Sequence, residues 1–112
     1  MSCLFCDIAA GKIPSQKVYE DEQMLAFKDL NPQAPVHILL IPKKHIDSLA
    51  QVGSDDAQVV AHIIECIAPI TQSLGCADSF RVVSNCGENA GQSVAHLHFH
   101  LLAGRMFSWP PG

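Results

Sequence analysis

The chain has 112 residues and is short of charge: Lys, Arg, Asp and Glu make up only 16% of it, against 48% apolar residues. This balance is typical of a compact folded protein and argues against disorder. The net charge of −4 provides no basic patch of the kind that binds nucleic-acid polymers. A small anionic ligand can still bind through local amide groups. The scarcity of charge also suggests that a second subunit covers part of the surface.

Long apolar segments are missing as well. No run reaches the roughly 18 residues that cross a bilayer, so we expect no membrane association. The N-terminus has neither the basic start nor the apolar stretch of a secretory signal, which favours a cytoplasmic protein. Five cysteines are an odd number, which argues against a pure disulfide framework. A chain of this length has room for one core, so we expect a single domain over residues 1–112.

Local patterns predict an α+β domain with a mostly antiparallel, five-stranded sheet, one long helix and one short helix. Apolar residues at helical spacing follow Ser54, a good N-cap, and end at Gly75, with a kink expected at Pro69. His62 falls on this helix, on its exposed side by the same spacing. The short helical pattern covers residues 4–10. Short apolar runs predict strands at residues 18–20, 24–27, 36–41, 80–84 and 96–102.

The most informative segment reads His96-Leu97-His98-Phe99-His100-Leu101-Leu102. Side chains alternate across a strand, so the three imidazoles share one face while the apolar residues between them pack into the core. Histidine acts as a nucleophile, acid, base or metal ligand near neutral pH. We interpret the row as a built site, with metal binding as the alternative. A neutral imidazole at the centre can attack phosphorus while its neighbours stabilise the developing charge.

The loop at residues 85–93 leads directly into the histidine segment. Its Gly91 permits a backbone conformation that other residues avoid and lets a ligand approach the backbone closely. Gln92 and Ser93 each add a donor, and successive free amides in a bend form an anion-binding concavity. An ordinary turn is the alternative. Placed next to three imidazoles, the loop predicts a cradle for a phosphate or carboxylate group.

Cys3 and Cys6 have the C-x₂-C spacing that makes up half of a zinc site. Two more ligands are needed, and His45 and His96 are the natural candidates because they lie at the ends of two predicted strands. A Cys₂His₂ tetrahedron would attach the N-terminus to the sheet and would give His96 a structural role. Two free thiols are the alternative.

The segment His96–Leu102 resembles the motif of the histidine triad (HIT) family, His-φ-His-φ-His-φ-φ. The resemblance covers almost the whole chain, and the ending Trp109–Gly112, with Gly104-Arg105 before it, is similar to the Hint branch of purine nucleoside phosphoramidases. The other matching segments are Phe5–Pro14, Asp29–Pro35, Pro42–His45 and Gly91–Val94.

The resemblance implies a HIT-like fold whose sheet continues across a homodimer. It implies hydrolysis of purine nucleoside phosphoramidates such as adenosine 5′-monophosphoramidate, through a nucleotidyl-histidine, with release of AMP or GMP. No cofactor is then required for catalysis, although some relatives hold a structural zinc at positions like those of the two cysteines, His45 and His96. The alternatives are a dinucleoside polyphosphate hydrolase, disfavoured by the C-terminal ending, and a nucleotide-binding regulatory protein with little turnover, disfavoured by the intact triad with Ser93.

The resemblance also implies residue roles. His98 would be the nucleophile, His100 and Gln92 would contact the phosphate, and Ser93 would contact the leaving group. Trp109 would reach the partner subunit's site and influence which leaving group fits. The implied catalytic set is His98, His100, Ser93, His96 and His37, the last as a supporting polar group. The implied substrate-binding set adds Asp29 for the ribose hydroxyls (a turn cap is the alternative), Asn85, Gly91, Gln92 and Val94 beside the phosphate, and Leu4, Phe5, Ile8, Phe27, Leu30 and Leu39 as an apolar slot for the base.

Overall fold

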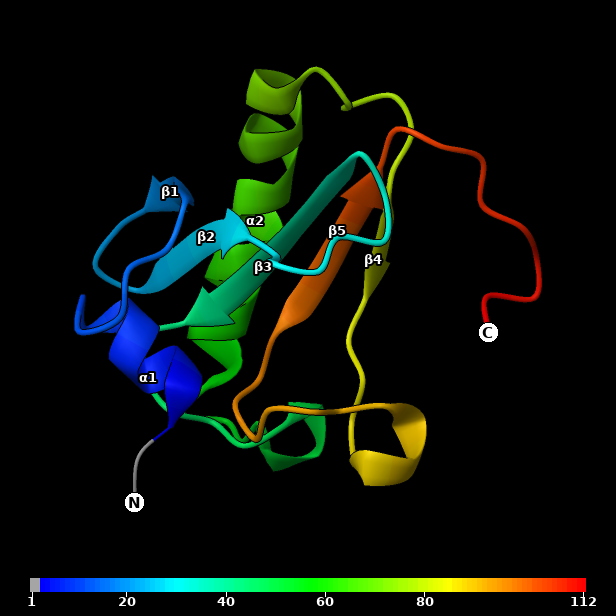
Figure 1. Cartoon of the computed structure of the whole chain (residues 1–112). Helices are drawn as coiled ribbons and strands as arrows, with labels where there is room; N and C mark the ends of the chain where they lie inside the picture. Colours follow the sequence, from blue (N-terminus) through cyan, green and yellow to red (C-terminus); the bar gives the residue numbers. More distant parts are fainter. Residues whose placement is uncertain (1–2) are drawn as a thin grey trace.

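The computed structural model describes residues 3–112, and it has the α+β architecture that the sequence predicts. Five antiparallel strands form one sheet in the order β1-β2-β3-β5-β4, so that β1 and β4 are its edges (Figure 1). No helix among the described residues is long and apolar enough to cross a bilayer. The elements are α1 (Leu4–Ala9), β1 (Lys17–Glu20), β2 (Met24–Lys28), β3 (Val36–Pro42), η1 (Leu49–Gln51), α2 (Ala57–Leu74), β4 (Arg81–Val83), η2 (Glu88–Ala90) and β5 (Phe99–Ala103).

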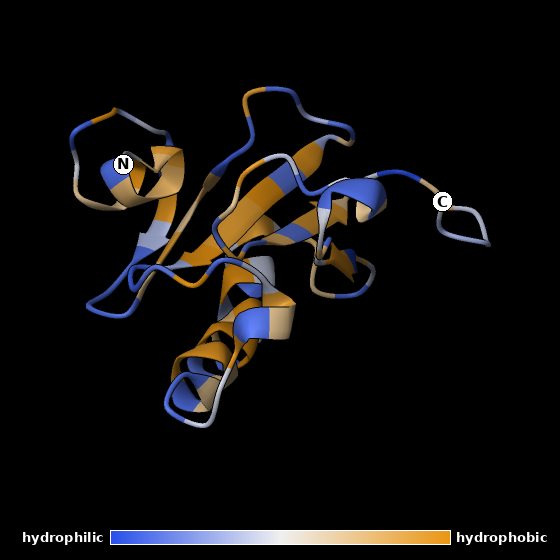
Figure 2. Cartoon of the chain, turned by 90° about the horizontal axis from the view of Figure 1, so that it is seen from below, coloured by the Kyte–Doolittle hydropathy of each residue, from blue (hydrophilic) through white to orange (hydrophobic). Residues whose placement is uncertain are grey.

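The two faces of the sheet bury different helices. Because side chains alternate along each strand, one set of apolar residues packs against α2 and the other against α1. Figure 2 shows α1 and α2 on opposite sides of the apolar strands. The α2 side includes Met24, Ala26, Ile38, Leu40, Phe99 and Leu101, and the α1 side includes Leu25, Phe27, Leu39 and Ile41 with Phe5 and Ile8 of α1.

The long helix departs from the sequence-based expectation at its start. Asp56, not Ser54, occupies the N-cap position, and the Asp56 carboxylate makes no capping bond because it pairs with Lys44. The helix continues unbroken past Pro69 to Gly75, which ends it in the left-handed conformation at φ 75°. His62 is not free on an exposed side: its Nε2 lies 2.6 Å from a carboxylate oxygen of Asp21, which joins α2 to the β1–β2 hairpin.

The histidine segment is only partly a strand. β5 begins at Phe99, because the backbone before it is bonded to loops instead of a neighbouring strand: the amide of Leu97 donates to the carbonyl oxygen of Ile46 at 2.6 Å. The predicted alternation nevertheless holds. Leu97, Phe99 and Leu101 all belong to the core on the α2 side, while the imidazoles of His96 and His98 contact the Phe5 ring of α1.

Candidate functional site

A cavity of about 270 Å³ lies between α1 and the sheet, beside the histidine row. All six residues expected in the apolar slot line it, namely Leu4, Phe5, Ile8, Phe27, Leu30 and Leu39. The lining also includes Val94 and the polar residues Ser15, Lys28, Asp29, Ser93, His98 and His100. An apolar wall with a few converging polar groups is the usual character of a small-molecule site.

A contact with the backbone determines which nitrogen of the neutral His98 ring carries the proton. Its Nδ1 lies 2.7 Å from the carbonyl oxygen of His96. A carbonyl oxygen only accepts hydrogen bonds, so Nδ1 carries the proton of the neutral ring. The lone pair is then on Nε2, the nitrogen that a nucleophilic imidazole at the cavity wall requires.

Two further hydrogen bonds determine which nitrogen of the neutral His100 ring carries the proton. The backbone amide of Gln33 donates to Nδ1 of His37 at 3.0 Å, so the proton of the neutral His37 ring is on Nε2. That Nε2 lies 2.9 Å from Nδ1 of His100, which therefore accepts and leaves the His100 proton on its own Nε2. Burial lowers the pKa of His37 and of His100, and this favours the neutral rings at pH 7. His100 thus presents an N–H donor, while His98 presents a lone pair.

The Asp29 side chain caps a turn and also lines the first cavity, so both predicted roles, turn cap and ribose contact, are compatible with its position. One carboxylate oxygen caps a turn by accepting from the amide of Asn31 at 2.8 Å, and the other lies 3.4 Å from Nε2 of His37. The side chain also lines the cavity, so a contact with ribose stays a prediction that this geometry permits.

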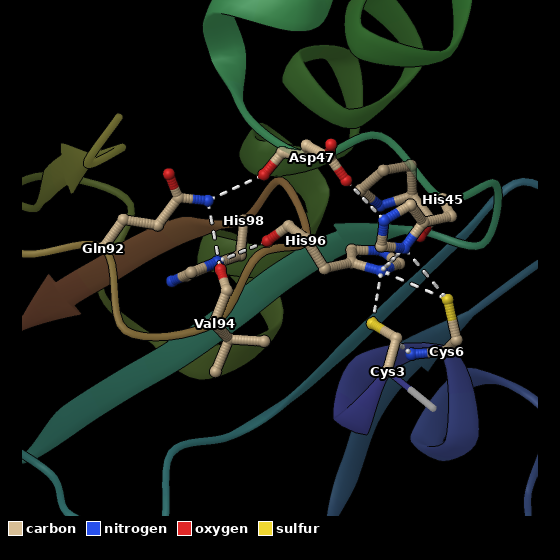
Figure 3. Close-up of polar contacts among 9 residues, drawn as sticks. Cys3, Cys6, His45, Asp47, Gln92, Val94, His96 and His98 are labelled. Atoms are coloured by element: carbon tan, nitrogen blue, oxygen red, sulfur yellow. Dashed lines mark hydrogen bonds and ion pairs between the residues drawn. The ribbon is translucent and has the colours of Figure 1, made fainter. Parts of the chain in front are cut away.

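The loop before the histidines is organised differently from the expectation. The Gln92 side chain donates to the carbonyl oxygens of Asp47 and Val94 at 2.7 and 3.0 Å (Figure 3). It also accepts from the amide of Gly87 at 2.8 Å. Its polar atoms are therefore used to hold the loop, and the amides of Gly91 and Gln92 are also bonded within it. Within residues 3–112, the amides of Ser93 and Val94 donate no hydrogen bond. The predicted cradle is thus shorter than expected and begins at Ser93.

Four other predicted residues lie outside the first cavity. His37 and Asn85 line a neighbouring cavity together with His100. Trp109 is 81% exposed and contributes to neither cavity in the single chain. His96 is fully buried, its two ring nitrogens are both engaged, and it lines neither cavity, so its place in the implied catalytic set is corrected to a structural one.

The four predicted metal ligands come together beside α1 (Figure 3). Nδ1 of His96 lies 3.3 Å from the sulfur of Cys3 and 3.5 Å from that of Cys6, and Nδ1 of His45 lies 3.2 Å from the sulfur of Cys6. The two Nδ1 atoms are 3.2 Å apart. Zinc bonds of about 2.3 Å to sulfur and about 2.0–2.1 Å to nitrogen give tetrahedral edges of roughly 3.3–3.8 Å. The observed spacing therefore suits a tetrahedral ion.

The outer nitrogens of the two histidines support the same interpretation. Nε2 of His96 lies 2.9 Å from the carbonyl oxygen of Pro42, and Nε2 of His45 lies 2.7 Å from a carboxylate oxygen of Asp47. Both acceptors require the proton on Nε2, so in the neutral rings both Nδ1 lone pairs point at the same centre. Two facing lone pairs repel each other unless a cation lies between them. Contacts from carbonyl and carboxylate groups to the outer nitrogen are the usual surroundings of metal-bound histidines.

Asp47, which contacts His45, is a site residue that the sequence could have indicated. It stands two positions after His45 in an exposed loop, a spacing that lets a carboxylate orient an imidazole. Pro42 contributes only its backbone oxygen, for which no side-chain pattern gives a signal. Ile13, Pro14, Ser15 and Lys28 also line the first cavity, and only the folded chain brings them there.

The fold and the site define an α+β protein in which two histidines of the row, His98 and His100, line a ligand-sized cavity. A family model described as the HIT domain matches residues 10–107, so the chain belongs to the HIT family. The resemblance seen in the sequence is therefore confirmed for the family, while assignment to the Hint branch stays a prediction.

Known HIT proteins are similar in sequence and structure to this chain over nearly its whole length. The crystal structure of a HIT family hydrolase from Legionella pneumophila is 46% identical, covers 99% of this chain and 100% of its own, and superposes with a TM-score of 0.96. A histidine triad protein from Clostridium difficile is 51% identical over 96% of this chain and 95% of its own, with a TM-score of 0.92. An uncharacterised HIT-like protein from Synechocystis is 49% identical over 97% of this chain and 96% of its own.

Proposed function

We propose that the chain is a hydrolase that cleaves the P–N bond of purine nucleoside phosphoramidates, of the adenosine 5′-monophosphoramidase type. The observation that carries this proposal is the contact of His98 Nδ1 with the carbonyl oxygen of His96, which sets the tautomer of a ring that lines the cavity. A lone pair held on Nε2 at a ligand-sized cavity suits nucleophilic attack on phosphorus. The name of the Legionella relative, a HIT family hydrolase, supports hydrolytic chemistry.

The first step transfers the nucleotide to the enzyme. Nε2 of His98 attacks the α-phosphorus, the P–N bond to the leaving amine breaks, and a nucleotidyl-histidine forms. Ser93, which lines the cavity, would pass its hydroxyl proton to the departing nitrogen. His100 would donate its Nε2–H to a phosphoryl oxygen and stabilise the charge that develops there.

The second step restores the enzyme. Water attacks the same phosphorus and gives one proton to the Ser93 oxygen, which replaces the proton lost to the amine; the bond between phosphorus and Nε2 of His98 breaks, and AMP or GMP leaves. His98 regains its lone pair on Nε2, while its Nδ1–H keeps donating to the carbonyl oxygen of His96. Splitting the displacement into two steps replaces one difficult reaction with two easier ones.

The rest of the cavity suits a nucleoside. A purine ring fits the apolar slot, where the edge-to-face ring pair of Phe5 and Phe27, with centroids 5.6 Å apart, forms part of the wall. Asp29, which also lines the cavity, would accept from the ribose hydroxyls. In this proposal the base lies in the apolar slot and the phosphate lies at His98 and His100.

We further propose that Cys3, Cys6, His45 and His96 hold a structural zinc ion. The ion would supply a fixed link between α1 and the sheet, and no step of the reaction involves it. The link has a consequence for the site, because α1 also carries Leu4, Phe5 and Ile8 of the apolar slot. His96, held by the ion, in turn orients His98 through its backbone carbonyl.

The homodimer implied by the family resemblance is also a proposal, supported by the open edge of the sheet at β4. The strand β4 has one neighbour, and its other side leaves backbone groups free to pair with a second copy. Ile64 and Phe80, at 49% and 37% exposure, are apolar residues on α2 and next to β4. We expect light scattering at micromolar concentration to give the mass of two chains, and the mass of one chain would contradict this proposal.

The test of the proposed function compares two substrates. We expect wild-type protein to release AMP from adenosine 5′-monophosphoramidate faster than from a diadenosine polyphosphate. Preferential cleavage of the dinucleotide would assign the protein to the polyphosphate hydrolases instead. If neither compound is turned over while AMP still binds, the protein is a nucleotide-binding protein and the hydrolase proposal is wrong.

Replacing Ser93 with alanine gives a prediction for the leaving group. A poor leaving amine needs a proton as the P–N bond breaks, whereas a good leaving group such as a phenolate does not. We expect Ser93→Ala to slow release of simple amines by roughly 10²-fold or more, and release of a phenolate from the matching ester by a much smaller factor. The measurement is kcat/KM for both substrates with both proteins. Equal losses would show that Ser93 acts before bond cleavage and not on the leaving group.

A further inference from the structure

A second cavity, of about 220 Å³, adjoins the first on the same face of the sheet, and His100 lines both. The cavities differ in character. The first is apolar at the base end, whereas the second contains two arginines and an asparagine amide. Its walls are formed by Gln33, His37, Arg81, Val83, Asn85, His100, Leu102, Arg105, Phe107 and Pro111, none of which is acidic.

The strand register explains why Arg81 faces this cavity. In the antiparallel pair β4–β5, Arg81 lies opposite Leu102 and Val83 lies opposite His100. Opposite residues share a face, so Arg81 projects on the same side of the sheet as His100. Val82, between them, packs on the α2 side. The position of this guanidinium is therefore set by the sheet.

Both arginines contact the same aromatic ring, that of Phe107. The guanidinium carbon of Arg81 lies 5.1 Å from the centroid of Phe107, and that of Arg105 lies 4.3 Å from it. Arg81 uses one donor on the carbonyl oxygen of Ser108, and Arg105 uses two, on the carbonyl oxygens of Gln33 and Met106. A guanidinium has five N–H donors. Among residues 3–112, no acceptor is bonded to the other N–H donors of Arg81, so these donors can bind a ligand.

No carboxylate offsets this positive charge inside the second cavity. Both arginines lack an ion-pair partner among the described residues. Asp29 lies 3.4 Å from His37 but lines the first cavity. Two guanidinium groups that line one cavity without a counter-ion suit an anion, and the planar guanidinium matches the oxygens of a carboxylate or a phosphate.

We propose that the second cavity is a subsite for the leaving group and that it selects leaving amines bearing an anionic oxygen group, with Arg81 as the specificity-determining residue. This inference rests on the proposed hydrolysis of phosphoramidates. An in-line displacement expels the leaving group on the side of phosphorus opposite the nucleophile. His98 lines the first cavity and not the second, while His100 lies between them. A phosphate at His100 would therefore have room for its leaving group in the second cavity.

This subsite is compatible with the proposed dimer. Pairing at the open edge of β4 uses backbone groups in the plane of the sheet, whereas Arg81 projects from its face. The shared chemistry of the ligand is an anionic oxygen group, and this group can be a carboxylate, as in an amino acid, or a phosphate. The two sources are distinguished by the substrates below.

The test uses three AMP phosphoramidates that differ at the leaving amine: β-alanine, its neutral amide, and phosphoethanolamine. We expect wild-type kcat/KM to be about tenfold higher for β-alanine than for the amide, the size expected of one charge-assisted hydrogen bond. Arg81→Gln should bring that ratio close to one while changing turnover of the neutral amide by less than about twofold. Arg81→Lys should keep part of the preference, because it keeps the charge and loses the planar fork.

Lys12→Gln is the matched control, because it removes the same charge from an exposed residue outside both cavities. It should leave the ratio unchanged. A higher value for phosphoethanolamine than for β-alanine would identify phosphate as the preferred group. The inference is overturned if wild-type protein does not distinguish β-alanine from its amide, or if Arg81→Gln lowers both equally. If none of the three is hydrolysed by wild-type protein, the proposed function itself fails, which is a separate result from loss of the preference.

Discussion

Replacing His98 with asparagine is expected to lower turnover of adenosine 5′-monophosphoramidate by at least about 10⁴-fold, as loss of a catalytic nucleophile does. Asparagine has an N–H₂ group that can still donate to the carbonyl oxygen of His96, so the buried hydrogen bond is retained. It has no nitrogen lone pair with which to attack phosphorus. The variant should therefore fold and bind nucleotide while failing to hydrolyse it. The measurements are the rate of AMP release and the dissociation constant of AMP.

A matched control separates this effect from the general loss of a histidine. His62→Gln removes an imidazole on α2, on the other side of the sheet, and glutamine can still bond to Asp21. We expect His62→Gln to keep wild-type turnover. Mass spectrometry of acid-quenched wild-type protein should also detect a nucleotide bound to His98. If His98→Asn retains turnover, or the trapped nucleotide lies on another residue, the nucleophile is misassigned.

Removal of zinc is expected to lower the melting temperature by at least about 10 °C. The four ligands come from α1, from the segment after β3 and from the segment before β5, so the ion joins three separate parts of the chain. Without it, two Nδ1 lone pairs face each other at 3.2 Å. Elemental analysis should give one zinc per chain, and thermal unfolding with and without a strong chelator measures the effect.

Cysteine variants make this test specific. Cys6→Ser should reproduce the destabilisation caused by the chelator and should become insensitive to it. Cys86→Ser is the control: Cys86 is exposed, lies outside the cluster and lies 3.5 Å from the Ser48 hydroxyl, a contact that serine can keep. Protein that is free of metal and has an unchanged melting temperature would show that the cluster is two thiols beside two histidines.

The parts of the site that follow a short-range rule could be predicted from the sequence. The alternation of residues 96–102 gave the correct face for each imidazole, because the side-chain period of an extended chain is a local property. The C-x₂-C spacing identified two members of the four-residue cluster, and the ends of two predicted strands supplied the other two. The lining of the apolar slot followed from the family resemblance, since Phe27 and Leu39 alone look like ordinary core residues.

The parts that the sequence did not reveal depend on contacts between distant segments. The phosphate contact of Gln92 stays a prediction, but the bond of its amide to the carbonyl oxygen of Asp47, 45 residues away, could not be foreseen. Asp56 caps α2 by position alone, because Lys44 takes its carboxylate. Arg81 gave no signal in the sequence, since only the pairing of β4 with β5 brings it beside His100. No local pattern records such partners.

The alternation around β5 has a consequence for how this chain tolerates insertions and deletions. Adding one residue between His96 and His100 would reverse the facing of everything after it, so that a histidine would enter the core against α2 and an apolar side chain would enter the site. A two-residue insertion restores the facing but moves the nucleophile about 7 Å along the strand, away from the carbonyl oxygen that fixes its proton. The length of this segment is therefore constrained as tightly as its composition, whereas exposed loops such as residues 104–112 are under no such constraint from β5.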